Sequence, residues 1–235
     1  MPKTMDEFMD VCAKLSDAGI QPMAVAGKEQ WPLTRLIGAY ATQAGGNDLL
    51  VKANAGEVSW KDDAFLEAYK WIAEMGEKGY MGEGMTTVDS DTQNSLFTSG
   101  MAAMCYNGSW FTESLSSDQN TLGENVGFFA FPTVKDGKGT ANTYTTSYGM
   151  YMCVKNDSYD DAMGAWLGYI MKNFGNKGME LHNWITPYAT TEDFDMGYFT
   201  KLLSDATESE GAASVWPEYA MPTSVQDVEY QAHRW

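Results

Sequence analysis

The sequence has few cysteines, histidines and basic residues, and it has no long apolar run. Its 235 residues include 3 cysteines, 2 histidines and 15 lysines plus arginines, against 32 acidic residues, so the net charge is −17. This acidic balance excludes the basic face that nucleic-acid binding requires, and it disfavours docking on anionic lipid headgroups. No apolar stretch reaches the length of about 18 residues that a transmembrane helix needs.

The scarce reactive residues also lack the spacing of catalytic or metal sites. Neither histidine has a neighbouring ligand at metal-binding spacing. Cys12, Cys105 and Cys153 are odd in number and stand in apolar settings, so we expect buried free thiols and at most one disulfide. Ser109 does not stand in the Gly-x-Ser-x-Gly pattern of a nucleophile. The sequence predicts no catalytic residue, metal or cofactor, although two of its many carboxylates could still form a glycosidase pair.

Aromatic residues, by contrast, are abundant. The chain has 8 tryptophans, 13 tyrosines and 10 phenylalanines, with 44% hydrophobic and 20% charged residues. This composition supports a sizeable core in one large domain or two small ones. Aromatic residues mostly pack in cores. An excess of Trp and Tyr is also typical of sites that stack on sugar rings.

Apolar periodicity and turn residues indicate alternating helices and strands. Helices are predicted over 4–18, 31–45, 59–79, 160–174 and 191–206, and strands over 20–26, 101–106, 126–131 and 145–154. Thr4 and Glu7 have capping-box spacing at the start of the first helix, and proline follows Trp31 at the start of the second. The pattern predicts an α/β class of fold.

The most informative segment runs from Leu96 to Trp110. Ser90 and Gln93 stand before it at capping-box spacing, so we expect a helix that ends at Gly100. An apolar run of strand length follows, then an Asn-Gly turn and a serine that can cap the next helix. Trp110 comes at the C-terminal end of this strand, where α/β sheets bind ligands. From this segment alone, Trp110 is either a ligand-stacking residue or a core tryptophan.

Two segments carry a resemblance to a known family. The pattern Phe-x-x-Gly-x-Ala-Ala-Met-x-x-x-Gly-Ser-Trp over 97–110 resembles the signature of extracellular solute-binding proteins of ABC importers, the family that includes maltose-binding protein. The segment Pro-Lys-Thr-Met-Asp-Glu-Phe over 2–8, which closes with Ala-Gly-Ile-Gln-Pro over 18–22, is similar to a second family segment. The resemblance continues in order along nearly all of the chain.

The resemblance implies an α/β fold of the periplasmic-binding-protein-like type II, mainly its C-terminal lobe, helix-rich with a small mixed sheet. Residues 1–134 are then expected to form most of that lobe. Residues 140–215 are expected to return to an N-terminal lobe that this chain largely lacks. Residues 216–235 are expected to cross back to the C-terminal lobe, where the chain is truncated.

The resemblance also implies a ligand-binding cleft. In sugar-binding relatives the tryptophan at the position of Trp110 stacks on a pyranose ring. The other residues expected at the cleft are Trp31, Asn107, Ser109, Tyr148, Gly149, Trp184 and Tyr230. Trp31 has a second interpretation as an apolar staple at a helix start. Arg35 and Arg234 are the two arginines of the chain, and this scarcity favours a neutral sugar over an anionic ligand.

The implied function is the substrate-binding component of an ABC importer, which binds a sugar or oligosaccharide and docks on membrane permease subunits. We expect an extracellular or periplasmic location, with a lipid anchor in the full-length protein and an export signal upstream of Met1. Two other classes stay open, a glycan-active enzyme domain and an α/β interaction domain whose aromatic residues are all core. A turnover assay on glycosides separates the first from a binding protein, and sugar titration followed by tryptophan fluorescence separates the second.

Overall fold

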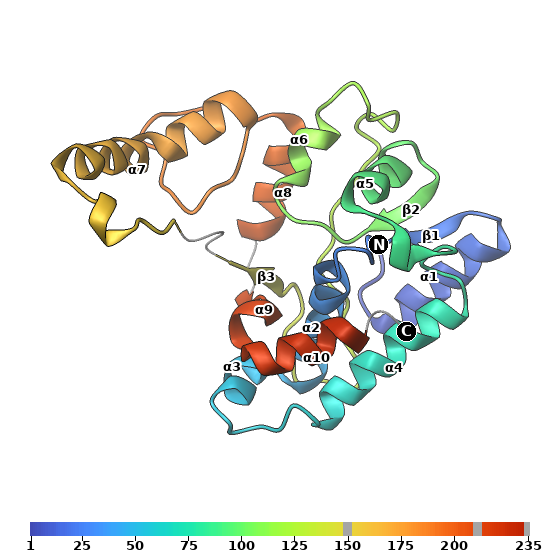
Figure 1. Cartoon of the computed structure of the whole chain (residues 1–235). Helices are drawn as coiled ribbons and strands as arrows, with labels where there is room; N and C mark the ends of the chain where they lie inside the picture. Colours follow the sequence, from blue (N-terminus) through green and yellow to red (C-terminus); the bar gives the residue numbers. More distant parts are fainter. Residues whose placement is uncertain (148–151, 209–212, 233–235) are drawn as a thin grey trace.

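The computed structural model describes residues 1–147, 152–208 and 213–232, and it is rich in helix (Figure 1). The described helices are α1 (Met5–Asp17), α2 (Trp31–Gly45), α3 (Leu49–Asn54), α4 (Asp63–Glu77), α5 (Ser90–Thr98), α6 (Phe111–Leu115), α7 (Asp161–His182), α8 (Tyr198–Glu208), α9 (Pro217–Ala220) and α10 (Thr223–Ala232). The described strands are β1 (Gln21–Ala24), β2 (Ala102–Cys105), β3 (Tyr144–Thr146) and β4 (Ala213–Val215). No helix in the described part of the chain has both the length and the apolar character needed to cross a membrane. The helix-rich α/β fold expected from the sequence is confirmed.

The first sheet joins two strands that are far apart in the chain. β1 and β2 pair in parallel, with Met23 opposite Met104, and α2 to α5 form the connection between them. The apolar side chains of α1, β1, α2 and α4 meet in one core, which includes Phe8, Leu36 and Trp71. This core fixes the direction in which the chain leaves the C-terminal end of β2.

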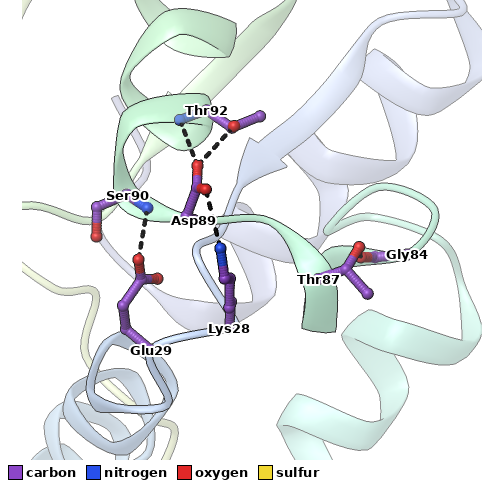
Figure 2. A network of polar contacts seen from close by, with 7 residues as sticks. All are labelled: Lys28, Glu29, Gly84, Thr87, Asp89, Ser90 and Thr92. Carbon is purple, nitrogen blue, oxygen red and sulfur yellow. Dashed lines mark hydrogen bonds and ion pairs between the residues drawn. The ribbon is translucent and has the colours of Figure 1, made fainter.

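A polar network ties the segment after β1 to the start of α5 (Figure 2). Asp89 Oδ1 accepts hydrogen bonds from the backbone N–H and the hydroxyl of Thr92, and Lys28 Nζ lies 3.2 Å from the other carboxylate oxygen. These contacts hold the pKa of Asp89 down at about 2. Glu29 Oε1 accepts from the backbone N–H of Ser90 at 3.1 Å. Asp89, and not Ser90 as predicted, therefore caps α5, because its side chain reaches the free backbone donor.

The second sheet brings the C-terminal part of the chain back to α2 and α3. β3 and β4 pair in parallel, with Thr145 opposite Ser214, and α9 and α10 then lie beside α2 (Figure 1). The contact is close at Gly38, where an added Cβ would lie only 2.1 Å from the ring of Pro217. Both described sheets are small, and the strand pairs that they contain are parallel.

Helix α7 extends away from the elements around the first sheet (Figure 1). It begins with Asp160, whose Oδ1 accepts from the backbone N–H of Met163, and it continues past the predicted end at 174. Trp166 and Met171, two large apolar residues within the predicted span, are 54% and 37% exposed. Instead α7 buries Gly175, Gly178 and Met179, because the chain folds back only beside its C-terminal half.

Several predicted boundaries differ from the structure. Residues 126–131, expected as a strand, run without a ladder partner, although Phe129 and Phe131 pack against the core; only Thr133 forms a bridge, with Thr4. The helix predicted over 191–206 begins at Tyr198. The helix predicted over 59–79 is α4, which is shorter at both ends and covers Asp63–Glu77. The strand predicted over 145–154 is described only as β3. Apolar side chains thus mark burial in these segments, but burial alone does not create strand pairing.

Candidate functional site

Trp110 lies in the turn that follows β2. Its backbone is the N-cap residue of α6, and its side chain is 41% exposed. The indole ring lies against Gly108, since an added Cβ there would come within 2.2 Å of the ring. The side chain of Asn107 holds the turn: its Nδ2 donates to Asn94 Oδ1 at 2.8 Å and its Oδ1 accepts from the N–H of Gly108. The turn therefore presents Trp110 at the surface, whereas a core tryptophan would be buried.

The predicted N-cap role of Ser109 is not seen. Its side chain makes no capping hydrogen bond to α6, and the hydroxyl of Thr112 instead donates to the carbonyl of Ser109 at 2.9 Å. The capping position falls one residue later than predicted, at Trp110, because the Asn-Gly turn continues through Ser109.

Three tryptophans from distant parts of the chain meet at this point, and we call them the tryptophan cluster: Trp31, Trp110 and Trp216. The ring centroids of Trp31 and Trp110 are 6.1 Å apart with an interplanar angle of 72°, and those of Trp110 and Trp216 are 6.0 Å apart at 88°. Such edge-to-face pairs are a favourable arrangement of aromatic rings. Trp216 also stacks on Tyr219 at 5.8 Å. Each tryptophan comes from a different part of the chain: Trp31 begins α2, Trp110 is the N-cap residue of α6, and Trp216 follows β4.

Arg35 lies inside the tryptophan cluster. Its guanidinium carbon is 4.2 Å from the ring centroid of Trp31, 3.5 Å from that of Trp216 and 5.7 Å from that of Trp110. Its Nε donates to Glu218 Oε1 at 2.8 Å, and the two side chains are only 12% and 13% exposed. The scarcity of arginine favoured a neutral ligand, and Arg35 was not among the residues expected at the cleft. The available signal was the spacing of four residues between Trp31 and Arg35, which puts both on one face of α2.

A pocket of about 780 Å³ opens beside the tryptophan cluster, and we call it the aromatic pocket. It falls within the size range of small-molecule sites. Its lining near the cluster includes Trp31, Arg35, residues 106–110, residues 143–147 and Trp216, and its inner end reaches the core at Phe8 and Trp71. The hydroxyls of Tyr106 and Thr145 lie 2.9 Å apart and join the segment after β2 to β3, and burial raises the pKa of Tyr106. The pocket thus combines aromatic faces with neutral hydrogen-bonding groups.

The residues predicted for the cleft divide into three groups. Trp31, Asn107, Ser109 and Trp110 line the aromatic pocket. Trp184 and Tyr230 do not: Trp184 Nε1 donates to Glu113 Oε2 at 3.0 Å beside a stacked His182, and the hydroxyl of Tyr230 accepts from Gln226 Nε2. Tyr148 and Gly149 lie outside the described residues.

Within the described ranges, no group of three or more His, Cys, Asp or Glu side chains could hold a metal ion. The three cysteines are free. Burial raises the pKa of the Cys12 and Cys105 thiols to about 12, so both stay protonated at neutral pH. Cys153 was also expected to be buried, but it is exposed.

The fold and the pocket define a class of protein. A pocket at the C-terminal ends of parallel strands, lined by aromatic rings and neutral polar groups, is typical of small-ligand sites in α/β proteins. Residues 2–173 match the family model of the bacterial extracellular solute-binding protein, and the chain belongs to that family.

Comparison with individual proteins also finds extracellular and sugar-binding proteins. The chain is 24% identical over 168 residues to an uncharacterized ABC transporter extracellular-binding protein of Pyrococcus horikoshii, a match that covers 72% of the chain and 36% of the relative. Its fold is similar to that of a chitin oligosaccharide binding protein, with a TM-score of 0.85 and 23% identity, over 100% of this chain and 59% of the other. It is also similar to a structure from work on xylan utilization by the thermophilic bacterium Caldanaerobius polysaccharolyticus, with a TM-score of 0.84 and 21% identity, over 100% and 62% of the two chains. The chain therefore spans about 60% of the length of these solved structures.

Proposed function

We propose that this chain is part of the substrate-binding component of an ABC importer and that it binds a sugar or oligosaccharide. The observation that carries the proposal is the tryptophan cluster at the edge of the aromatic pocket. The family match and the names of the relatives support a binding protein in place of an enzyme. The names of the two solved relatives support an oligosaccharide as the class of ligand.

The chemistry of a pyranose suits this pocket. The ring offers an apolar C–H face and a rim of hydroxyl groups, and an aromatic ring covers the first while polar groups bind the second. Trp110 is the residue that we assign to stacking, because its indole is 41% exposed. Asn107 and Ser109 stand beside it as hydrogen-bonding groups. Trp216 already contacts Arg35 and Tyr219, so we assign it a supporting role.

In the whole protein we propose two lobes that close on the ligand and then dock on permease subunits. Residues 1–134 form most of the C-terminal lobe, residues 140–215 return to the other lobe, and residues 216–235 cross back. The exposed apolar side chains of α7 support this assignment, since they have the character of a face that packs on more protein. Trp184, which does not line the aromatic pocket here, belongs to the segment 140–215 that such a closure would move. An extracellular or periplasmic location follows from the family, with a lipid anchor as the means of retention.

Substitution of Trp110 by alanine tests the proposal. Calorimetry on the whole protein that contains this chain is expected to show tight binding of a neutral oligosaccharide, and Trp110→Ala is expected to weaken it by about 30-fold or more, the effect of losing a buried aromatic anchor. Trp60→Ala is the matched control, because Trp60 packs on Phe65 and does not line the aromatic pocket. An unchanged dissociation constant in Trp110→Ala, or turnover of glycosides by the wild-type protein, would contradict the proposal.

A further inference from the structure

The hydroxyl groups of Tyr106 and Thr145 meet at the wall of the aromatic pocket. Their oxygens lie 2.9 Å apart, and the geometry allows either to donate to the other. Both residues line the pocket, and both are partly exposed. Tyr106 directly follows β2, whereas Thr145 is the middle residue of β3, so the contact joins segments that are 39 residues apart in the chain.

The pair has more hydrogen-bonding capacity than this contact uses. Each hydroxyl carries one hydrogen, and the mutual bond uses only one of the two. Within the described residues, neither hydroxyl has a further hydrogen-bond partner. Tyr106 keeps its hydrogen at neutral pH, because burial raises its pKa although the hydrogen bond to Thr145 and the charge of Arg35 act in the opposite direction. One O–H group of the pair is therefore left to donate to whatever fills the pocket.

The chemistry of the two hydroxyls indicates which hydrogen is left. A phenol is a stronger acid than an alcohol, and its oxygen is the weaker acceptor because a lone pair is shared with the ring. Tyr106 therefore donates to Thr145 Oγ1, and the hydrogen of Thr145 is the one available to a ligand. Accepting from Tyr106 fixes the rotation of the Thr145 hydroxyl and polarises it, which strengthens its own donation.

We propose that Thr145 is a ligand-binding residue of the aromatic pocket: its hydroxyl donates to a hydroxyl oxygen of a neutral sugar, and Tyr106 is the positioning residue that orients and polarises it. The assignment rests on the proposed function, in which Trp110 stacks on the sugar ring, since Trp110 and Thr145 line the same pocket. A sugar that contacts both residues bridges residues 1–134 and the returning segment 140–215.

The test compares Thr145→Val and Tyr106→Phe with the wild-type whole protein, because each change removes a hydroxyl and keeps the shape of the side chain. The probes are xylotetraose, chitotetraose and raffinose, measured by calorimetry. For the probe that binds most tightly, Thr145→Val is expected to weaken binding by about 10-fold, as the loss of one neutral hydrogen bond implies. Tyr106→Phe is expected to weaken it by about 3-fold, because Thr145 keeps its hydrogen but loses its orientation.

The double variant and a conservative variant separate a binding role from a structural one. The double variant is expected to bind as Thr145→Val does, because Tyr106 acts through Thr145 and the two losses do not add. Thr145→Ser keeps the hydroxyl and is expected to bind within about 2-fold of wild type. Tyr80→Phe is the control for loss of a tyrosine hydroxyl, since Tyr80 is buried and does not line the aromatic pocket. Circular dichroism checks that each variant is folded.

The outcomes distinguish this inference from the proposed function. If wild type binds none of the neutral probes, the proposed function fails. If wild type binds a probe and Thr145→Val binds it equally well, this inference alone is overturned. The same holds if Thr145→Ser binds as weakly as Thr145→Val, or if the losses of the two single variants add to about 30-fold in the double variant.

Discussion

At the scale of single residues, the most unusual group is the carboxyl of Glu229 on α10. The residue is only 3% exposed, and burial raises the pKa of its side chain to about 8. The nearby carboxylate of Glu218 adds to this shift. Burial, with the charge of Glu229 as a second cause, also raises the pKa of Tyr69. A carboxyl with a pKa of about 8 is protonated in the folded protein at neutral pH. Glu229 also lies near Glu218, the partner of Arg35 in the ion pair.

Glu229→Gln is expected to change the pH dependence of stability. The folded state keeps a proton that the unfolded state loses above the ordinary pKa of 4.5, so wild type loses stability as the pH rises from about 4.5 to about 8. Glutamine imitates the protonated form, and its advantage in melting temperature is expected to be small at pH 5 and larger by about 5 °C or more at pH 8. Thermal unfolding across this range measures the difference.

Asp227→Asn provides the control for this measurement, because Asp227 is an exposed carboxyl on the same helix. Its melting temperature should follow that of wild type at both pH values. Parallel curves for wild type and Glu229→Gln would show that Glu229 does not stay protonated in the folded state.

At the scale of secondary-structure elements, α7 differs from the others in what surrounds it. Trp166 and Tyr169 are 54% and 68% exposed on its N-terminal half, whereas its C-terminal half packs on the segment that follows. Gly175 makes this packing possible, since an added Cβ would lie 2.6 Å from the carbonyl oxygen of Ala189 and 2.8 Å from that of Tyr188. The helix is therefore anchored to the chain through its second half.

Gly175→Ala and Gly168→Ala on α7 are expected to have opposite effects on stability. Alanine favours a helix over glycine by about 0.5–1 kcal/mol at either position. At Gly168 an added Cβ meets no atom within 4 Å, so the melting temperature should stay the same or rise. At Gly175 the methyl group collides with backbone atoms that cannot move aside, so the melting temperature should fall. Equal melting temperatures for the two variants would contradict the close packing at Gly175.

At the scale of the whole molecule, the aromatic pocket forms because the C-terminal part of the chain returns to α2. The segment after β4 packs on α2, which puts Trp216 and Glu218 against Trp31 and Arg35. The chain spans about 60% of the length of the solved relatives. Under the proposed function, the missing contacts to the ligand come from the rest of the whole protein.

The 235-residue chain alone is accordingly expected to bind sugar weakly. A ligand that contacts one wall of a cleft loses the hydrogen bonds and the exclusion of water that closure provides. Calorimetry with the same oligosaccharide on the chain and on the whole protein should give a dissociation constant at least about 100-fold higher for the chain, as expected when several polar contacts are lost. Equal affinity in the two would refute the role of a second lobe in binding.

Much of the local structure could be predicted from neighbouring residues. Thr4 caps α1 as its spacing with Glu7 indicated, and proline begins α2 directly after Trp31. The turn at Asn107 presents Trp110 as predicted. Other local predictions were wrong where two residues competed for one role, as at Asp89 and Ser90, or where an apolar run such as 126–131 found a core but no partner strand.

The sequence by itself determined the positions of α1, α2 and α4, the strand-end position of Trp110 and the resemblance to the family, because caps, turns and apolar periodicity act over a few residues. Only the tertiary structure decided which distant residues share the aromatic pocket. The sequence does not connect Arg35 with Glu218, and the two residues become neighbours because β3 pairs with β4 and α9 packs on α2. Such contacts depend on how the core fixes the path of the whole chain, and no local pattern records that path.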